Sequence, residues 1–126
     1  MDYGLNRLLA DLKDLDYENL STKVDSEGKN YVVISNYKVI LGIFEGKIID
    51  LAIPAPDDFP RSIGACIHVK ASPILFEKGN VPPIRNIQDS KLGEDWQYWS
   101  FTFRAVPENP TKDLMEQING VFRKIK

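Results

Sequence analysis

The chain has 126 residues, enough for a single domain over 1–126 whose hydrophobic core is stable without disulfides or structural metal ions. We expect it to use no cofactor and no metal. A formal net charge of −2, scattered lysines and the lack of any run of 18 apolar residues argue against nucleic acid and membrane partners. The one cysteine, Cys66, excludes an internal disulfide and a cysteine-based zinc site, and acids among the first leucines do not fit a signal peptide, so we expect a cytoplasmic protein.

Hydrophobic periodicity predicts that the chain begins with a helix followed by an antiparallel meander. Five leucines between Leu5 and Leu15 recur at helical spacing, so we expect an amphipathic helix that ends near Asp16. Runs of β-branched and aromatic residues bounded by turn residues then predict strands. These strands are expected over 17–24, 31–34 with a continuation through 39–44, 48–53 and 63–69. One helix before about four antiparallel strands indicates the α+β class.

The second half of the chain is predicted to hold a long loop, a short strand and a helix. Residues 71–95 contain three prolines and two glycines with little periodicity, which indicates an irregular segment of the kind that often carries function. Alternation returns over 96–101. Asn109 as N-cap and Pro110 at the first helical position then predict a C-terminal helix with apolar residues on one face.

Cys66 and His68 are the only thiol and the only imidazole in the chain. Strand alternation places them on the same face, about 7 Å apart along the strand, which is too far for a proton-transfer pair unless the side chains lean together. Apolar neighbours raise the pKa of a thiol and make it inert, so a small buried residue is favoured over a nucleophile at Cys66. For His68, a structural role is favoured over that of a general base.

Two pairs of carboxylates and two tryptophans are further candidates. Asp57–Asp58 and Glu94–Asp95 could perform acid–base chemistry, but both pairs lie in turn contexts, which favour solvated loop charges. Trp96 and Trp99 could form a stacking platform for a ligand. Packing of these rings under the long loop is favoured instead.

The order of helix, meander, proline-bounded strand, long loop, tryptophan and helix resembles that of ubiquitin-conjugating enzymes. Residues 51–54, Leu-Ala-Ile-Pro, with Phe59-Pro60, resemble the strand end and the "YPxxPP" segment of that family. Residues 93–100, Gly-Glu-Asp-Trp-Gln-Tyr-Trp-Ser, resemble the "G-x-x-W-Q-x-W-S" run of the prokaryotic ubiquitin-conjugating-like family E, which is associated with ubiquitin-like modification operons. The resemblance spans roughly Leu5 to Ile125. It implies a four-stranded meander under an N-terminal helix.

The resemblance also implies a partner, which would be a ubiquitin-like protein or its activating enzyme. We expect Trp96, Trp99 and Phe59 to contact that partner.

The sequence departs from the family at the catalytic position. The usual His-Pro-Asn tripeptide is missing, with only Ala71-Ser72-Pro73 near its place, and residues 71–95 contain no cysteine. Cys66 falls too early, inside the segment that resembles the fourth strand. The family often has Arg-His after its Trp-Ser, where this chain has Phe101-Thr102. We also expect the two helices that end the usual fold to be missing, because the predicted C-terminal helix after Asn109 reaches the last residues of the sequence.

Three hypotheses follow from these observations. The first is a noncatalytic protein that binds a ubiquitin-like modifier or its activating enzyme. The second is an active conjugating enzyme that carries the modifier on Ser90 or Cys66; Ser90 lies nine residues before Trp99, where the cysteine is expected, but only Asp89 or Asp95 is evident as its base. The third is an unrelated small α+β interaction or immunity protein.

Overall fold

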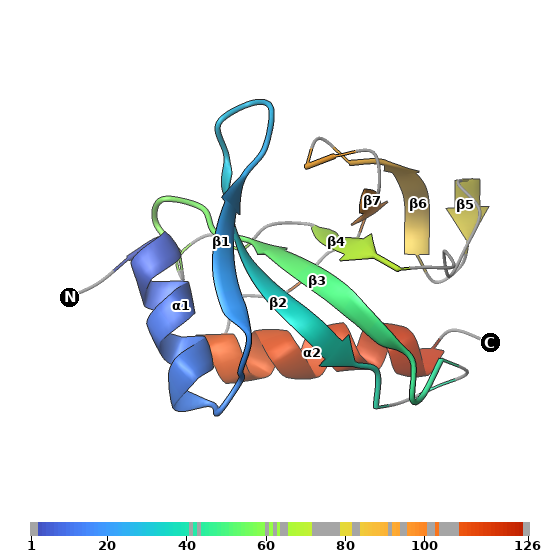
Figure 1. Cartoon of the computed structure of the whole chain (residues 1–126), viewed down its shortest axis with the longest axis horizontal. Coiled ribbons are helices and arrows are strands. Elements are labelled where there is room, and N and C mark those ends of the chain that lie inside the picture. Colours follow the sequence, from blue (N-terminus) through green and yellow to red (C-terminus); the bar gives the residue numbers. More distant parts are fainter. Residues whose placement is uncertain are drawn as a thin grey trace.

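The computed structural model describes residues 3–40, 42, 44–59, 61, 63, 66–71, 79–81, 84–90, 92–93, 96–100, 103 and 109–124. Its elements in chain order are α1 (Leu5–Asp14), β1 (Leu20–Val24), β2 (Asn30–Lys38), β3 (Ile48–Pro54), β4 (Cys66–Lys70), β5 (Gly79–Val81), β6 (Ile84–Asp89), β7 (Trp96–Ser100) and α2 (Pro110–Lys124) (Figure 1). Both predicted helices and the predicted strands at β3 and β7 are confirmed.

The described strands form one sheet in the order β1-β2-β3-β4-β7-β6-β5, and every neighbouring pair is antiparallel. β1 to β4 are the predicted meander, and β7 returns to pair with β4. The α+β class is therefore confirmed, with a sheet that extends beyond the four strands expected.

The prediction of an irregular segment over 71–95 is wrong for residues 79–81 and 84–89, which form β5 and β6. β6 pairs with β7 so that Ile87 lies opposite Trp99 and Gln88 lies opposite Tyr98. Backbone pairing to a neighbouring strand can hold a segment extended even where its own sequence shows little alternation. The pairing of β6 with β7 fixes the position of Ser90, which directly follows β6.

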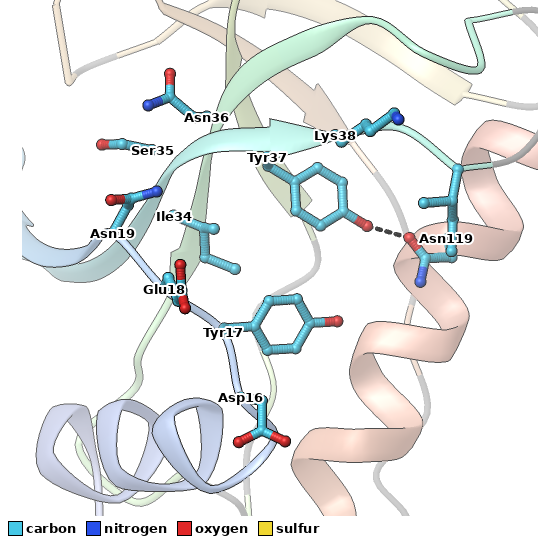
Figure 2. A pocket seen from close by; sticks show the side chains of 11 residues that line it. Asp16, Tyr17, Glu18, Asn19, Ile34, Ser35, Asn36, Tyr37, Lys38 and Asn119 are labelled. Carbon is cyan, nitrogen blue, oxygen red and sulfur yellow. Dashed lines mark hydrogen bonds between the residues drawn. The ribbon is translucent and has the colours of Figure 1, made fainter.

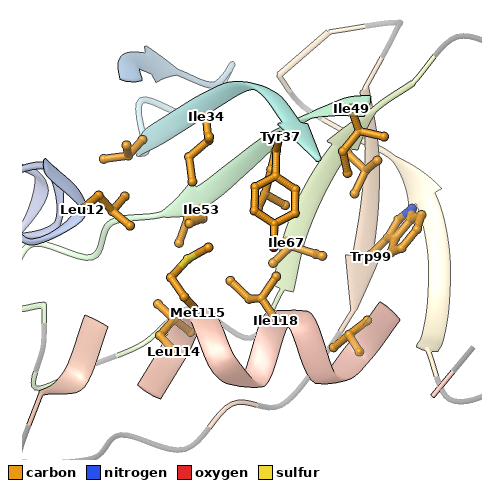
Figure 3. Packing of buried hydrophobic residues seen from close by; sticks show 14 of the residues in the cluster. Leu12, Ile34, Tyr37, Ile49, Ile53, Ile67, Trp99, Leu114, Met115 and Ile118 are labelled. Carbon is orange, nitrogen blue, oxygen red and sulfur yellow. The ribbon is translucent and has the colours of Figure 1, made fainter. Parts of the chain in front are cut away.

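The main core lies between one face of the sheet and the two helices (Figure 1). Alternate residues of the central strands face it, such as Ile53 on β3 and Ile67 on β4, and α2 contributes Leu114, Met115 and Ile118. Figure 3 shows these side chains pointing toward one another across the layer. Burying each such side chain contributes about 1.5–3 kcal/mol, so this layer is the main source of stability.

A second, smaller cluster covers the opposite face of the sheet. It consists of Tyr31, Val33, Ala52, Leu92 and Trp96, all buried. Leu92 comes from the segment that joins β6 to β7 and Trp96 is the first residue of β7, so the end of the predicted loop packs on the outer face of the meander. The face that turns away from α2 is therefore partly enclosed.

Three predicted strand boundaries are corrected by the backbone. β1 begins at Leu20 rather than at residue 17. Asp16 and Asn19, which precede it, have φ angles of 67° and 58°, in the left-handed region outside the regular β conformation. β4 begins at Cys66 rather than at residue 63. The strand expected over 39–44 is wrong for the residues described there, 39, 40, 42 and 44, none of which lies in a strand. Gly42 has a φ of 84° and lies against the backbone of α2 at Phe122.

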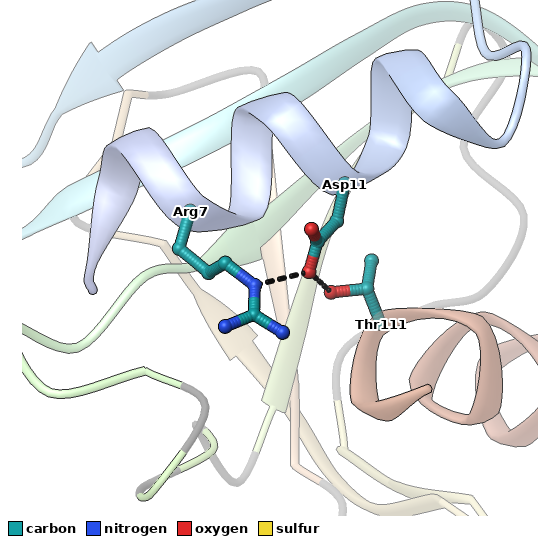
Figure 4. A network of polar contacts seen from close by, with 3 residues as sticks. All are labelled: Arg7, Asp11 and Thr111. Carbon is teal, nitrogen blue, oxygen red and sulfur yellow. Dashed lines mark hydrogen bonds and ion pairs between the residues drawn. The ribbon is translucent and has the colours of Figure 1, made fainter. Parts of the chain in front are cut away.

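A polar contact joins the two helices. The Thr111 hydroxyl at the start of α2 donates to Asp11 Oδ2 of α1 at 2.7 Å, and Arg7 Nε donates to the same oxygen at 2.8 Å (Figure 4). Because Arg7 and Asp11 are both partly exposed, their ion pair contributes no more than about 1 kcal/mol to stability. Its effect is to fix where α1 crosses the N-terminal end of α2.

Candidate functional site

The candidate site is built around His68 in the middle of β4. In the sheet register His68 lies opposite Ala52 of β3 and Tyr98 of β7, so its side chain points to the outer face, away from α2. Cys66 lies two residues earlier on the same face. Both side chains are buried, with 3% of His68 and 9% of Cys66 exposed.

His68 bridges the two residues that the sequence offered as alternative carriers. Its Nε2 lies 3.5 Å from the Sγ of Cys66, and its Nδ1 lies 2.6 Å from the Oγ of Ser90. The two side chains lean together over one strand repeat, which is the condition under which the sequence allowed a contact between Cys66 and His68. The structural, hydrogen-bonded role expected of His68 is observed.

Ser90 acquires a neighbouring base that the sequence did not reveal. The sequence pointed only to Asp89 and Asp95; the side chain of the first and the whole of the second lie outside the described residues. The antiparallel pairing of β6, β7 and β4 brings Ser90 to His68 across 22 positions of sequence. The N–H of Leu92 also donates to Ser90 Oγ at 3.0 Å, so the hydroxyl oxygen is held from two sides.

Two arrangements of protons satisfy this chain of three side chains. In one, Ser90 donates to Nδ1 and the Nε2 proton is directed at Cys66; in the other, the thiol donates to Nε2 and Nδ1 donates to Ser90. Both use a neutral imidazole. Only the first arrangement prepares Ser90 to give up its proton.

Sequence analysis missed a second layer made by Tyr31 and Asp25. The Tyr31 ring meets His68 edge to face, with ring centroids 4.8 Å apart, and its hydroxyl donates to Asp25 Oδ2 at 2.8 Å. Asp25 Oδ1 accepts the backbone N–H groups of Glu27 and Lys29. An Asp at the start of a Gly-containing turn often accepts hydrogen bonds from backbone N–H groups of that turn, so this part was readable from the sequence. The contact of Asp25 with the Tyr31 hydroxyl depends on the pairing of β1 with β2 and was not.

The electrostatics keep the sulfur and the imidazole uncharged. Burial raises the pKa of Cys66 to about 12, against a smaller opposing effect of the Lys29 charge. Burial lowers the pKa of His68 to about 4, against a smaller opposing effect of the Asp25 carboxylate. For Asp25 burial acts to raise the pKa, but the hydrogen bonds from Lys29, Tyr31 and Glu27 outweigh it and lower the pKa. The pair is therefore a thiol beside a neutral imidazole and not a thiolate–imidazolium pair.

The low pKa of His68 predicts a loss of stability in mild acid. The unfolded chain binds a proton near pH 6.5 and the folded chain only near pH 4, so the free energy of unfolding should fall as the pH drops through that window. The full effect is at most about 3 kcal/mol. Urea unfolding of the wild-type chain and of His68→Gln from pH 7 to pH 4 should give curves that converge toward low pH. Parallel curves would show that the imidazole titrates normally in the fold.

The structure places the remaining candidate residues as follows. Trp99 and Phe59 are fully buried in the main core, and Trp96 is buried in the outer cluster, which supports the packing interpretation of the tryptophans. Their assignment as partner contacts stays a prediction, and it would require buried side chains to become accessible. Asp57 and Asp58 are exposed in a turn, as solvated loop charges are. Glu94 and Asp95 lie outside the described residues.

The described part of the chain contains neither a cluster suited to a metal ion nor a membrane-spanning helix. Among these residues, no three His, Cys, Asp or Glu side chains come close enough together to hold a metal ion. Of the two helices described, neither combines the length and the apolar character needed to cross a membrane.

The helix, antiparallel meander and C-terminal helix form the arrangement that the resemblance to ubiquitin-conjugating enzymes implied. The model of the prokaryotic E2 family E matches residues 7–126, so the chain belongs to this family. Comparisons with curated proteins and with solved structures gave no match. The hypothesis of an unrelated α+β protein is therefore wrong.

Proposed function

We propose that this protein is a noncatalytic member of its family, which binds a ubiquitin-like modifier or its activating enzyme without taking the modifier onto its own sulfur. The observation that carries the proposal is the state of the only thiol in the chain: Cys66 is buried within β4 and its pKa is raised to about 12. Membership of family E supports the class of partner.

The chemistry of thioester transfer explains why this thiol is decisive. The attacking species is a thiolate, and it must meet the carbonyl carbon of the modifier's terminal residue. At neutral pH a thiol with a pKa near 12 is almost wholly protonated. Cys66 is also only 9% exposed on the outer face of β4, so a modifier would reach the sulfur only if the side chains that cover it moved aside. Both conditions for transfer fail at this residue.

Isothermal titration calorimetry against a ubiquitin-like protein and an activating enzyme of the same organism tests the proposal. We expect one of them to bind, and Cys66→Ser to bind with the same dissociation constant, because the sulfur makes no contact with the partner. The control removes thiol chemistry while keeping the side-chain volume nearly constant. Binding of neither protein, or a loss of binding in Cys66→Ser, would refute a silent binding role.

The 2.6 Å contact between His68 Nδ1 and Ser90 Oγ favours a second candidate function, an oxyester carrier. In this reaction Ser90 Oγ forms a bond to the terminal carbonyl carbon of the modifier. The carbon–sulfur bond to the activating enzyme breaks, and the Ser90 proton passes through His68 to the leaving thiolate. The neutral imidazole can accept that proton, although a pKa near 4 makes it a weak base.

The two functions differ in whether a covalent adduct forms: the noncatalytic binder forms none, whereas the oxyester carrier forms one at Ser90. An oxyester survives a thiol reductant and is cleaved by alkali, and it should be absent from Ser90→Ala but present in Ser35→Ala, where another half-buried serine is removed. Denaturing gels after incubation with activating enzyme, ATP and modifier distinguish these cases. If no alkali-sensitive adduct forms, Ser90 is a structural partner of His68 and the oxyester role is excluded.

A further inference from the structure

A pocket of about 320 Å³ lies beside the end of β2 (Figure 2), and its lining includes none of Cys66, His68 and Ser90. Its walls come from the link between α1 and β1, from the second half of β2 and from α2. We call it the edge pocket; its lining includes Asp16, Tyr17, Glu18, Tyr37, Lys38 and Asn119. Its volume falls in the range of about 300–1,000 Å³ that ligand pockets occupy.

The edge pocket exists because β1 is shorter than β2. The two strands pair only as far as Leu20 opposite Ile34, and one further bond runs from the N–H of Ser35 to the carbonyl of Asn19. Beyond it the chain turns away toward α1, at residues with positive φ. Among the described residues, no strand continues β1 alongside the end of β2, and this stretch of strand edge lines the pocket instead.

The backbone of Lys38 is directed toward that open edge. Val39 donates its N–H to the carbonyl of Lys47 and accepts from the N–H of Gly46, so both backbone groups of Val39 point toward the β3 side. Successive residues of an antiparallel strand direct their backbone groups to opposite sides. The N–H and C=O of Lys38 therefore point into the edge pocket, where an extended segment could pair with them.

Side chains give the pocket an aromatic wall and an acidic rim. Tyr37 stands fixed, because its hydroxyl donates to Asn119 Oδ1 of α2, and the Tyr17 ring lies beside it in Figure 2. Asp16 and Glu18 flank Tyr17, both are exposed, and they oppose a single cation in the lining, Lys38. Aromatic rings next to carboxylates can bind a guanidinium or ammonium group, because the cation forms cation–π contacts with the rings and charge-assisted hydrogen bonds with the carboxylates.

We propose that the edge pocket binds an extended basic segment of a partner protein. The segment continues the line of β1 and pairs its backbone with Lys38. An Arg or Lys side chain of the segment lies over Tyr17 between the carboxylates of Asp16 and Glu18. The charges of the lining favour a positively charged segment, because the two carboxylates of Asp16 and Glu18 outnumber the one ammonium group of Lys38. They attract a basic segment and repel an acidic one.

Nuclear magnetic resonance with two designed peptides tests this proposal. One is a six-residue acetylated and amidated peptide of alternating threonine and valine with one central arginine; the other has glutamate in place of the arginine. We expect the arginine peptide to shift the amide signals of Lys38, Tyr17 and Asn119 and to slow hydrogen exchange at the Lys38 amide. The glutamate peptide should bind at least about tenfold more weakly.

The double variant Asp16→Asn/Glu18→Gln separates the acidic rim from general charge. Asn tolerates the positive φ of residue 16, so the fold should be kept. Glu45→Gln/Asp57→Asn removes the same charge from exposed sites outside the pocket and serves as the control. The first variant should remove the preference for arginine, and the second should retain it. Equal response to both peptides, shifts on another surface, or no shift at millimolar peptide would overturn the proposal.

Discussion

Replacing Gly42 with alanine is expected to lower the free energy of unfolding by about 3–5 kcal/mol. Gly42 has a φ of 84°, in the left-handed region that favours glycine, and a Cβ there would lie 2.0 Å from the carbonyl oxygen of Phe122. The clashing atom belongs to the backbone of α2, so no side-chain rotation can relieve it. Either the turn or the end of the helix must move, and the main core behind Phe122 would open with it.

Gly28→Ala is the matched control for this prediction. Gly28 has nearly the same φ, 82°, but a Cβ at that turn would meet nothing within 4 Å. It should therefore cost only the backbone strain, about 1–2 kcal/mol. Urea unfolding of both variants separates strain from collision. Equal losses in the two variants would show that the turn at Gly42 is not packed against α2.

The second large effect is expected at Trp99, where alanine should lower stability by about 3–5 kcal/mol. Trp99 is the largest of the fully buried side chains. Its ring centroid lies 5.7 Å from that of Phe122 on α2, and its indole N–H donates to Gln97 Oε1 at 3.2 Å. Truncation would leave a cavity between β7 and α2 that the surrounding strands and helix can fill only in part.

Two comparisons decide whether Trp99 and Trp96 are packing residues. Trp99→Phe should recover much of the loss, because it restores an aromatic ring without the indole N–H. Trp96→Ala removes the large aromatic ring of the outer cluster and should also destabilise the chain. If stability hardly changed in either alanine variant while binding to the modifier or activating enzyme disappeared, the rings would be partner contacts and the packing assignment would fail.

Features set by local sequence were predicted well. The leucine spacing of α1, the Asn109–Pro110 start of α2 and the alternation of β3 and β7 act within a few residues, so the pattern alone indicates them. The burial of Cys66 was also predicted from its apolar neighbours along the strand and is confirmed, whereas the inertness of its thiol stays a prediction. The run from Trp96 to Ser100 additionally carried the family resemblance that the match over residues 7–126 bears out.

Features set by pairing between distant strands were not predictable in the same way. β6 shows little alternation of its own, and its register with β7 is what brings Ser90 to His68. The contact of Cys66 with His68 depends on side-chain rotation that strand spacing does not fix. The edge pocket depends on where β1 begins. The residues before that start, Asp16 and Asn19, have positive φ angles that the hydrophobic pattern does not indicate. Such long-range and rotameric facts require coordinates.

The outer face of β4 is thus a compact polar cluster held in an uncharged state. The rings of Tyr31 and Tyr98 meet the imidazole of His68 edge to face. The thiol of Cys66 contacts Nε2 of the imidazole, and the Ser90 hydroxyl contacts Nδ1. Desolvation disfavours both the thiolate and the imidazolium, so each would have to form against the surroundings. The same cluster can therefore stabilise the sheet while offering no ready sulfur nucleophile.

Intact mass spectrometry after incubation with the activating enzyme, ATP and the modifier tests the silence of the sulfur most directly. The chain should retain its own mass under non-reducing conditions, because the buried thiol of Cys66 stays protonated. A mass increase equal to the modifier minus one water, removed by a thiol reductant and absent from Cys66→Ser, would contradict the account.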